Sequence, residues 1–250
     1  MTQTGMLSDK IALVTGASRG IGAAAARLFA REGATVVLAA RTENALKEVA
    51  TDIPGSSYVV TDLGDLASIE RAVSTVVERH GRLDIAFNNA GVGVPPHPIA
   101  DFPEHDFDLV LRVNLKGVFY AMSAEVKAMM SSGGGAIVNT SSVGSLIGNP
   151  ALPAYGAAKR AVNSLTESAA VTYGPSGIRV NAIAPGLTIT EMVEDWNRHD
   201  PGVIERIVAG TPLGRAARPE EIAESAAWLL SDRASYVTGA VLPVTGGAGV

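Results

Sequence analysis

The chain has no cysteine among its 250 residues, which excludes disulfide bonds, thiol nucleophiles and cysteine-ligated metal centres. It also has no apolar run long enough to cross a membrane as a helix, and its short polar start has no apolar signal region. The histidines are not spaced as metal ligands. We therefore expect a cytoplasmic protein that holds no metal.

Charge of either sign is also scarce. Charged residues make up 18% of the chain, and the net charge of −5 gives no electrostatic footprint for nucleic acid or an anionic membrane. Hydrophobic residues reach 47%, which fits an α/β protein whose sheet is covered on both faces. We therefore expect a small-molecule partner, with neither nucleic acid nor membrane as a partner.

Short apolar runs alternate along the chain with amphipathic, helix-favouring segments. We expect strands at 10–14, 34–40, 57–61, 83–87, 136–140, 178–183 and 240–244. We expect helices at 23–31, from 42 onward, and at 65–80, 104–130, 154–173 and 219–230. This order predicts an α/β fold of the Rossmann type, a doubly wound parallel sheet of about seven strands with helices on both faces.

Residues 187–218 depart from this rhythm, with mixed polarity, three glycines and two prolines. A long insertion without a strand in a compact α/β domain is usually functional or mobile. We interpret it as a lid over a substrate pocket, within a single domain that spans residues 1–250.

A glycine-rich turn follows the first expected strand and precedes an alanine-rich helix. Its glycines, Gly16, Gly20 and Gly22, leave room for the backbone to approach a pyrophosphate. The N–H groups that begin the helix would face that anion. The spacing is G-x-x-x-G-x-G, and an ordinary glycine-rich turn is the alternative, so the interpretation depends on the residues that follow.

Tyr155 and Lys159 lie four residues apart on an expected helix and therefore share one face. A free tyrosine has a pKa of about 10, and a neighbouring ammonium favours the phenolate and lowers that pKa. The pair is thus suited to proton transfer at neutral pH. A surface tyrosine that merely precedes a lysine is the alternative.

Further polar residues stand where strands end. Ser142 follows the fifth strand, at the edge where open parallel sheets place ligands, and could bond a substrate oxygen near Tyr155. Residues 88–91 end the fourth strand at the same edge and permit close approach to a cofactor, although a plain loop would look the same. Asn114 is a poor helix former inside an expected helix, which suggests a local role or simply an exposed asparagine.

Taken together, these motifs resemble the short-chain dehydrogenases/reductases, in their short single-domain branch of carbonyl reductases and 3-oxoacyl reductases. The resemblance covers nearly the whole chain. The matching positions are Thr15-Gly16-x-x-x-Gly20-x-Gly22, Asp62, Asn88-Asn89-Ala90-Gly91, Asn114, Ser142, Tyr155-x-x-x-Lys159, Pro185-Gly186 and Tyr236-Val237-Thr238-Gly239. Each motif is weak alone, but their order and spacing together are specific.

The resemblance implies four catalytic residues. Tyr155 would be the general acid in carbonyl reduction and the general base in alcohol oxidation, and Lys159 would lower its pKa and bond the nicotinamide ribose. Ser142 would orient the substrate oxygen, and Asn114 would support Lys159 through a water. The function implied is NAD(P)-dependent interconversion of a ketone and a secondary alcohol, with hydride from the nicotinamide.

The resemblance also implies a set of cofactor contacts. They are Gly16, Ser18, Arg19, Gly20, Ile21, Gly22, Arg41, Asp62, Leu63, Asn89, Ala90, Gly91, Tyr155, Lys159, Pro185, Gly186, Thr188 and Thr190. Thr188 stands at a place more often aliphatic in the family, which makes its contact less secure.

The end of the second strand indicates which nicotinamide cofactor the chain prefers. NAD enzymes usually have an acidic residue there, whereas this strand ends in Ala39-Ala40 and is followed by Arg41. Arg41 and Arg19 together would suit a 2′-phosphate. We therefore favour NADP(H), with NAD(H) as the alternative.

Apolar residues of the lid and of the loop after Ser142 predict a substrate of modest size and mostly apolar character. They are Val143, Leu146, Ile147, Met192, Val193 and Trp196, whereas Arg198 is expected on the surface. The resemblance implies a homotetramer. Other readings are a reductase of fatty-acid synthesis, an isomerase or lyase like longer relatives, and a non-catalytic nucleotide-binding regulator.

Overall fold

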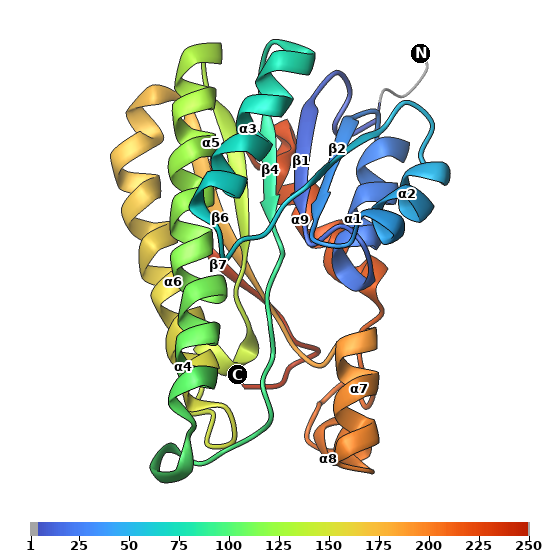
Figure 1. Ribbon diagram of the computed structural model, residues 1–250, viewed down its shortest axis with the longest axis vertical. Helices are drawn as coiled ribbons and strands as arrows, with labels where there is room; N and C mark the ends of the chain where they lie inside the picture. The colour runs from blue at the N-terminus through green and yellow to red at the C-terminus, as the bar shows by residue number, and fades with distance from the viewer. Residues whose placement is uncertain (1–4, 250) are drawn as a thin grey trace.

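The computed structural model describes residues 5–249, and a seven-stranded parallel sheet forms its centre (Figure 1). The spatial order of the strands is β3-β2-β1-β4-β5-β6-β7. The strands are β1 (Ile11–Thr15), β2 (Thr35–Ala40), β3 (Ser57–Val60), β4 (Ile85–Asn88), β5 (Gly135–Thr140), β6 (Ile178–Pro185) and β7 (Val241–Val244). The predicted doubly wound α/β fold is confirmed, and each strand lies within two residues of its expected bounds.

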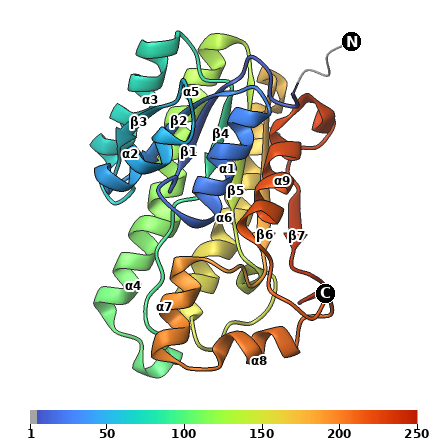
Figure 2. The same ribbon diagram turned by 90° about the vertical axis from the view of Figure 1, so that its right-hand side faces the viewer.

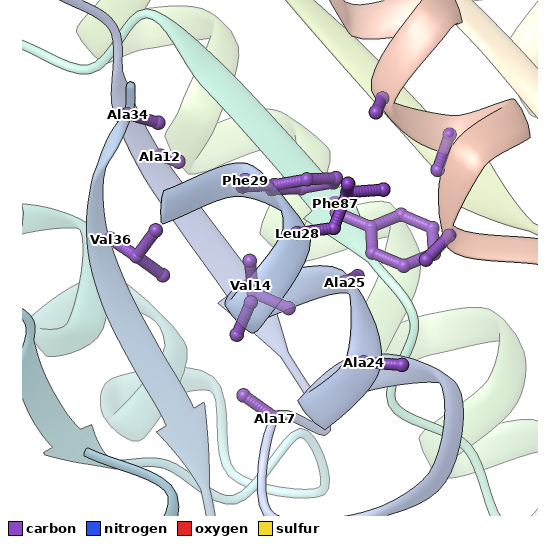
Figure 3. Packing of buried hydrophobic residues seen from close by; sticks show 14 of the residues in the cluster. Ala12, Val14, Ala17, Ala24, Ala25, Leu28, Phe29, Ala34, Val36 and Phe87 are labelled. Carbon is purple, nitrogen blue, oxygen red and sulfur yellow. The ribbon is translucent and has the colours of Figure 1, made fainter. Parts of the chain in front are cut away.

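Helices cover both faces of the sheet, as Figures 1 and 2 show. One face carries α1 (Gly20–Arg31), α2 (Glu43–Thr51) and α9 (Pro219–Leu230), and the other carries α3 (Leu66–His80), α5 (Val118–Ser132) and α6 (Pro153–Tyr173). Successive residues of β1 alternate between the faces: Val14 packs under α1, while Leu13 packs under α3 and α5. On the face that carries α1, the rings of Phe29 and Phe87 lie with their centroids 6.0 Å apart (Figure 3).

The expected helix over 104–130 is interrupted, and that expectation was wrong in its continuity. The structure has α4 (Glu104–Leu111), a π-helical turn (Arg112–Gly117) and then α5. The wider turn coincides with a close contact, because a Cβ on Gly117 would lie 2.6 Å from the carbonyl oxygen of Leu63. Such turns are frequent at functional sites, and this one contains Asn114.

Residues 187–218 contain two short helices, α7 (Glu191–His199) and α8 (Val203–Ala209). Figures 1 and 2 show both helices beyond the end of the sheet, outside the two covering layers. The segment returns to the sheet through a parallel bridge between Thr188 and Ala217. Within the described part of the chain, no helix is sufficiently long and apolar to span a membrane.

Candidate active site

The glycine-rich turn between β1 and α1 is packed so closely that side chains are excluded. Gly16 and Gly20 have φ values of 65° and 54°, which L-residues with side chains rarely adopt. A Cβ on Gly22 would lie 2.2 Å from the carbonyl oxygen of Gly16, and one on Gly16 would lie 2.8 Å from Cα of Ala90. The turn therefore depends on glycine at each of these positions.

Thr15 joins this turn to the loop after β4. Its hydroxyl oxygen accepts hydrogen bonds from the backbone N–H groups of Asn89 and Ala90, at 3.0 and 3.2 Å. The side chain of Asn89 donates in return to the carbonyl oxygen of Thr15, at 3.3 Å. The sequence interpretation gave Thr15 no role of its own. The signal that would have found it is a polar residue ending an otherwise apolar strand.

The start of α1 has the properties of an anion site. Arg19 occupies the N-cap position, and no side chain caps the helix there. The first N–H groups of an α-helix have no partner within the helix and carry the positive end of its dipole. The uncapped helix and the side-chain-free turn together fit the pyrophosphate of a dinucleotide.

The segment after β6 meets the same turn. A Cβ on Gly20 would lie 3.1 Å from Cγ2 of Thr190, the N-cap residue of α7. Thr188 is buried and donates to the carbonyl oxygen of Gly186 at 3.1 Å, and a Cβ on Gly186 would meet Cα of Thr245 at 2.9 Å. Pro185, the last residue of β6, pairs with Val244. The structure thus brings Thr190 to the glycine turn, whereas Pro185 and Gly186 lie against the end of β7 and Thr245.

Asn114 is fully buried and is held by both of its amide atoms. Its Oδ1 accepts from the N–H of Val92 and its Nδ2 donates to the carbonyl oxygen of Val92, each at 2.8 Å. A Cβ on Gly91 would lie 3.0 Å from Oδ1 of Asn114 and 3.8 Å from Nζ of Lys159. Gly91, Asn114 and Lys159 therefore converge on one point.

Tyr155 and Lys159 lie near the beginning of α6, beside the end of β5. The Tyr155 hydroxyl group lies near Ser142, which acts to lower its pKa, and the Ser142 hydroxyl oxygen accepts from the N–H of Gly144 at 3.1 Å. The ammonium of Lys159 lies 5.6 Å from the centre of the Tyr155 ring and donates to the carbonyl oxygen of Thr140 at 2.7 Å. All four predicted catalytic residues are thus gathered at the carboxyl edge of the sheet.

Burial changes the acidity of both groups. Burial raises the pKa of Tyr155, although Ser142 acts to lower it, and burial lowers the pKa of Lys159 to about 8. The expectation that Lys159 lowers the pKa of the tyrosine is not met within this chain. The physical reason is that the ammonium is itself desolvated and is directed to the carbonyl group of Thr140.

The adenosine end of the predicted site is more open. Asp62 accepts from the N–H of Gly64 at 2.8 Å, and Leu63 is buried beside it. Arg19 and Arg41 are exposed, and neither forms an ion pair with another described residue. Both guanidinium groups are therefore available to an anionic ligand.

The comparisons with known proteins agree with this geometry. A family model described as enoyl-(acyl carrier protein) reductase matches residues 16–249. The A-factor type gamma-butyrolactone 1'-reductase (1S-forming) of Streptomyces virginiae is 48% identical, over 97% of this chain and 96% of its own length. The chain belongs to the short-chain dehydrogenase/reductase family. As a short-chain dehydrogenase/reductase, it is an NAD(P)-dependent oxidoreductase that acts on a small molecule.

Solved structures share this fold. The crystal structure of levodione reductase has a TM-score of 0.93 and 38% identity, covering 96% of this chain and 98% of its own. A structure described as ribose-5-phosphate isomerase, from Brucella melitensis 16M, also has a TM-score of 0.93 and 38% identity, covering 97% and 93%. These two similar structures therefore bear the names of different reactions.

The apolar residues predicted to line the substrate pocket of this dehydrogenase/reductase lie on two sides. Within residues 187–218, Met192 lies next to Gly93, where an added Cβ would lie 3.7 Å from the Met192 sulfur. On the other side, Val143 and Ile147 lie against Gly249 near the end of the chain. Arg198 is exposed and pairs with Asp195 on the same helix, which confirms its expected surface position.

Proposed function

We propose that this protein interconverts a ketone and a secondary alcohol with NADP(H). The observation that supports it best is the grouping of Tyr155 with Ser142 and with the buried ammonium of Lys159, which lies 5.6 Å from the centre of the Tyr155 ring. A nicotinamide, when bound, supplies hydride to the carbonyl carbon or accepts it from the alcohol. The chain's own residues then have to supply and remove the proton.

We assign those residues as follows. The Ser142 hydroxyl holds the carbonyl oxygen and stabilises the charge that develops on it. The Tyr155 hydroxyl donates a proton to that oxygen in reduction and removes it in oxidation. Lys159, whose pKa is about 8, exchanges protons readily near neutral pH and can restore the proton of Tyr155. Asn114 holds the Val92 backbone beside Lys159.

For the nucleotide, we propose that residues 16–22 and the start of α1 hold the pyrophosphate. Asn89, Ala90 and Gly91 follow β4 next to that turn, and Asp62 and Leu63 follow β3 near the adenine. Pro185 to Thr190 would then border the nicotinamide. The side-chain-free cradle at Gly16 and Gly22 supports this assignment.

We expect the change Arg41→Asp to reverse the cofactor preference. Charge-assisted hydrogen bonds to a phosphate contribute about 1.5–3 kcal/mol each, so KM for NADPH should rise by about tenfold to a hundredfold. KM for NADH should change little, because its ribose has no 2′-phosphate. Steady-state kinetics with both cofactors measure this.

Arg31→Asp is the matched control for this change. Arg31 is exposed at the last residue of α1, far along the helix from the glycine turn, and the change in charge is the same. An equal effect of both variants on NADPH would mean that only net charge matters. A preference of the wild-type protein for NADH would refute the proposed role of Arg19 and Arg41.

The substrate we propose is a ketone of modest size and mostly apolar character, carried on or beside a ring. The apolar residues of the loop after Ser142 and of the lid support this, as do the names of the lactone reductase and of levodione reductase. In this proposal residues 187–218 close over the bound substrate as a lid. The lid belongs to the same single domain as the sheet.

The test is the loss of reduced-nicotinamide absorbance with NADPH and with NADH against a panel of cyclic, aryl and β-keto ester ketones. Turnover of at least one ketone with NADPH is the expected result. Conversion of a sugar phosphate without consumption of NADPH would favour an isomerase, the reaction for which one similar structure is named. Nucleotide binding without any turnover would favour a regulator.

We also propose a homotetramer. Large apolar side chains are exposed on α4, α5 and α6, among them Phe107 (44%), Phe119 (46%) and Val171 (81%). Tyr236, before β7, is fully exposed as well. Such surfaces mark protein interfaces. Light scattering coupled to size-exclusion chromatography measures the state directly, and a monomer at micromolar concentration would refute the proposal.

A further inference from the structure

A second cluster of buried polar side chains lies inside the protein. Two of its members, Asn88 and Asn139, each come one position before a residue at the proposed active site. Asn88 and Asn139 are register partners in the sheet. Nδ2 of Asn88 donates to Oε2 of Glu125 at 2.9 Å and to Oδ1 of Asn139 at 3.1 Å. Asn139 in turn donates to the hydroxyl oxygen of Thr166 at 2.9 Å. The cluster therefore joins β4, β5, α5 and α6.

Each of these elements carries, or is directly followed or preceded by, a residue at the proposed active site. On β4, Asn88 immediately precedes Asn89 of the cofactor loop. On β5, Asn139 immediately precedes Thr140, whose carbonyl group binds the ammonium of Lys159. The helix α6 carries Tyr155 and Lys159 as well as Thr166, and α5 continues from the turn that contains Asn114. A shift of the cluster would therefore shift the catalytic groups.

Glu125 is the unusual member of the cluster, because its carboxyl group is wholly buried and forms no ion pair with another described residue. Its Oε1 and the Oδ1 of Asn88 are both buried and have no hydrogen-bond partner among the described residues. Two acceptors cannot satisfy one another, whereas a protonated carboxyl group has a donor to offer. A neutral Glu125 therefore has a hydrogen to donate, whereas an ionised Glu125 adds a further buried acceptor without a donor.

The groups around Glu125 are mostly neutral. It is next to Asn88 on β4 and close to Asn139 on β5 and Thr166 on α6 through the hydrogen bonds above. Lys159 is the one buried charged residue on α6, and it is bound to Thr140. Other charged residues on the packed helices are exposed, namely Glu70, Arg71, Glu78, Arg79, Lys127, Arg160 and Glu167, and His80 is half-buried at the last residue of α3. Burial raises the pKa of Glu125 to about 7.

We propose that Glu125 is a positioning residue for the reaction: its buried carboxyl group fixes Asn88 and Asn139, and so aligns the cofactor loop after β4 with Thr140 and Lys159. The inference rests on the proposed function, because it concerns the alignment of that site. Glu125 touches neither substrate nor cofactor and acts through the two asparagines.

The direction of the pH effect follows from burial. The pKa of Glu125 is raised above its ordinary value of 4.5, so the folded protein keeps a proton there that the unfolded chain loses between pH 4.5 and about 7. The contribution of Glu125 to the free energy of unfolding is therefore most favourable below pH 4.5, falls as the pH rises to about 7 and is constant above pH 7. Above pH 7, ionised Glu125 would also repel the oxygen atom of Asn88.

The test compares Glu125→Gln with Glu125→Leu. The glutamine amide has the same size, keeps an acceptor for Asn88 Nδ2, adds an N–H donor and does not titrate. The leucine fills the space but removes the hydrogen bond between Asn88 and the carboxyl group, so that Asn88 keeps only its bond to Asn139. Glu167→Gln is the matched control, because it makes the same chemical change at an exposed position on α6.

The measurements are thermal and denaturant unfolding between pH 5 and 8, nucleotide affinity by nicotinamide fluorescence, and kcat and KM against pH. Between pH 5 and pH 8, the ratio of the unfolding equilibrium constant of Glu125→Gln to that of the wild-type protein should fall on the order of a hundredfold. In Glu125→Leu, kcat should fall by about tenfold, which corresponds to the loss of about one buried hydrogen bond, and KM for the ketone should change little. In Glu125→Gln, most of the wild-type kcat should be retained.

Each outcome decides the inference. An identical pH dependence of unfolding in wild type and Glu125→Gln, or a Glu125→Leu variant with wild-type kcat and nucleotide affinity, would overturn it. If the wild-type protein reduces no ketone, the proposed function fails. Glu125 is then judged by nucleotide affinity: a tenfold loss in the leucine variant that glutamine restores supports the inference, and an unchanged affinity refutes it.

Discussion

Replacing Tyr155 with phenylalanine should lower kcat for ketone reduction by about a thousandfold, which lies within the range that general acid–base groups contribute. Phenylalanine keeps the ring beside the ammonium of Lys159 but removes the hydroxyl group that lies near Ser142. Nucleotide affinity should remain close to that of the wild-type protein, because the glycine turn is untouched. NADPH absorbance measures the first effect and nicotinamide fluorescence the second.

Tyr173→Phe is the control for this prediction. Tyr173 is the last residue of the same helix, is half-buried, and loses the same oxygen atom. Its kcat should equal that of the wild-type protein. If Tyr155→Phe retained more than about a tenth of the wild-type kcat, another group would have to deliver the proton, and the role assigned to Tyr155 would be wrong.

The sheet could be predicted from the sequence because its signal is local. Each apolar run is short, is followed by glycine or polar residues, and alternates with a segment of helical period. In a parallel sheet the crossover connections then allow few topologies. The strand ends differ by one or two residues: β6, for example, continues to Pro185, because its last residues pair with β7.

The break in the 104–130 helix could not be predicted in the same way. Asn114 and Gly117 are poor helix formers but do not by themselves break a helix, and the π-helical turn coincides with contacts to distant parts of the chain. Leu63 closely approaches Gly117, and the backbone of Val92 holds Asn114. Tertiary contacts of this kind leave no periodic trace in the sequence.

The buried site was only partly visible for a related reason. Glycine spacing and the pair Tyr155 and Lys159 can be read directly, but the partner of Lys159 is a backbone carbonyl, which any residue at position 140 would supply. Glu125 was missed because a glutamate on a helix normally faces solvent. The raised pKa of Tyr155 depends on its burial, which only the folded structure reveals.

The change Gly22→Ala should have the second large effect, on nucleotide binding. Its Cβ would lie 2.2 Å from the carbonyl oxygen of Gly16 and 2.7 Å from Nδ2 of Asn89, so either the turn or the loop after β4 must move. Overpacking of this kind costs about 1–3 kcal/mol. We expect nucleotide affinity to fall at least tenfold, measured by fluorescence titration, and Tm to fall by about 2–12 °C.

Gly174→Ala provides the control, because a Cβ on Gly174 would have no atom within 4 Å apart from those of its two chain neighbours, and the φ of this residue is −53°. That variant should bind nucleotide as the wild-type protein does, and any fall in Tm should be small, since the only strain is that of an alanine in the α conformation before Pro175. Wild-type affinity in Gly22→Ala would show that α1 need not approach Gly16 closely. The pyrophosphate site would then have to lie elsewhere along the carboxyl edge of the sheet.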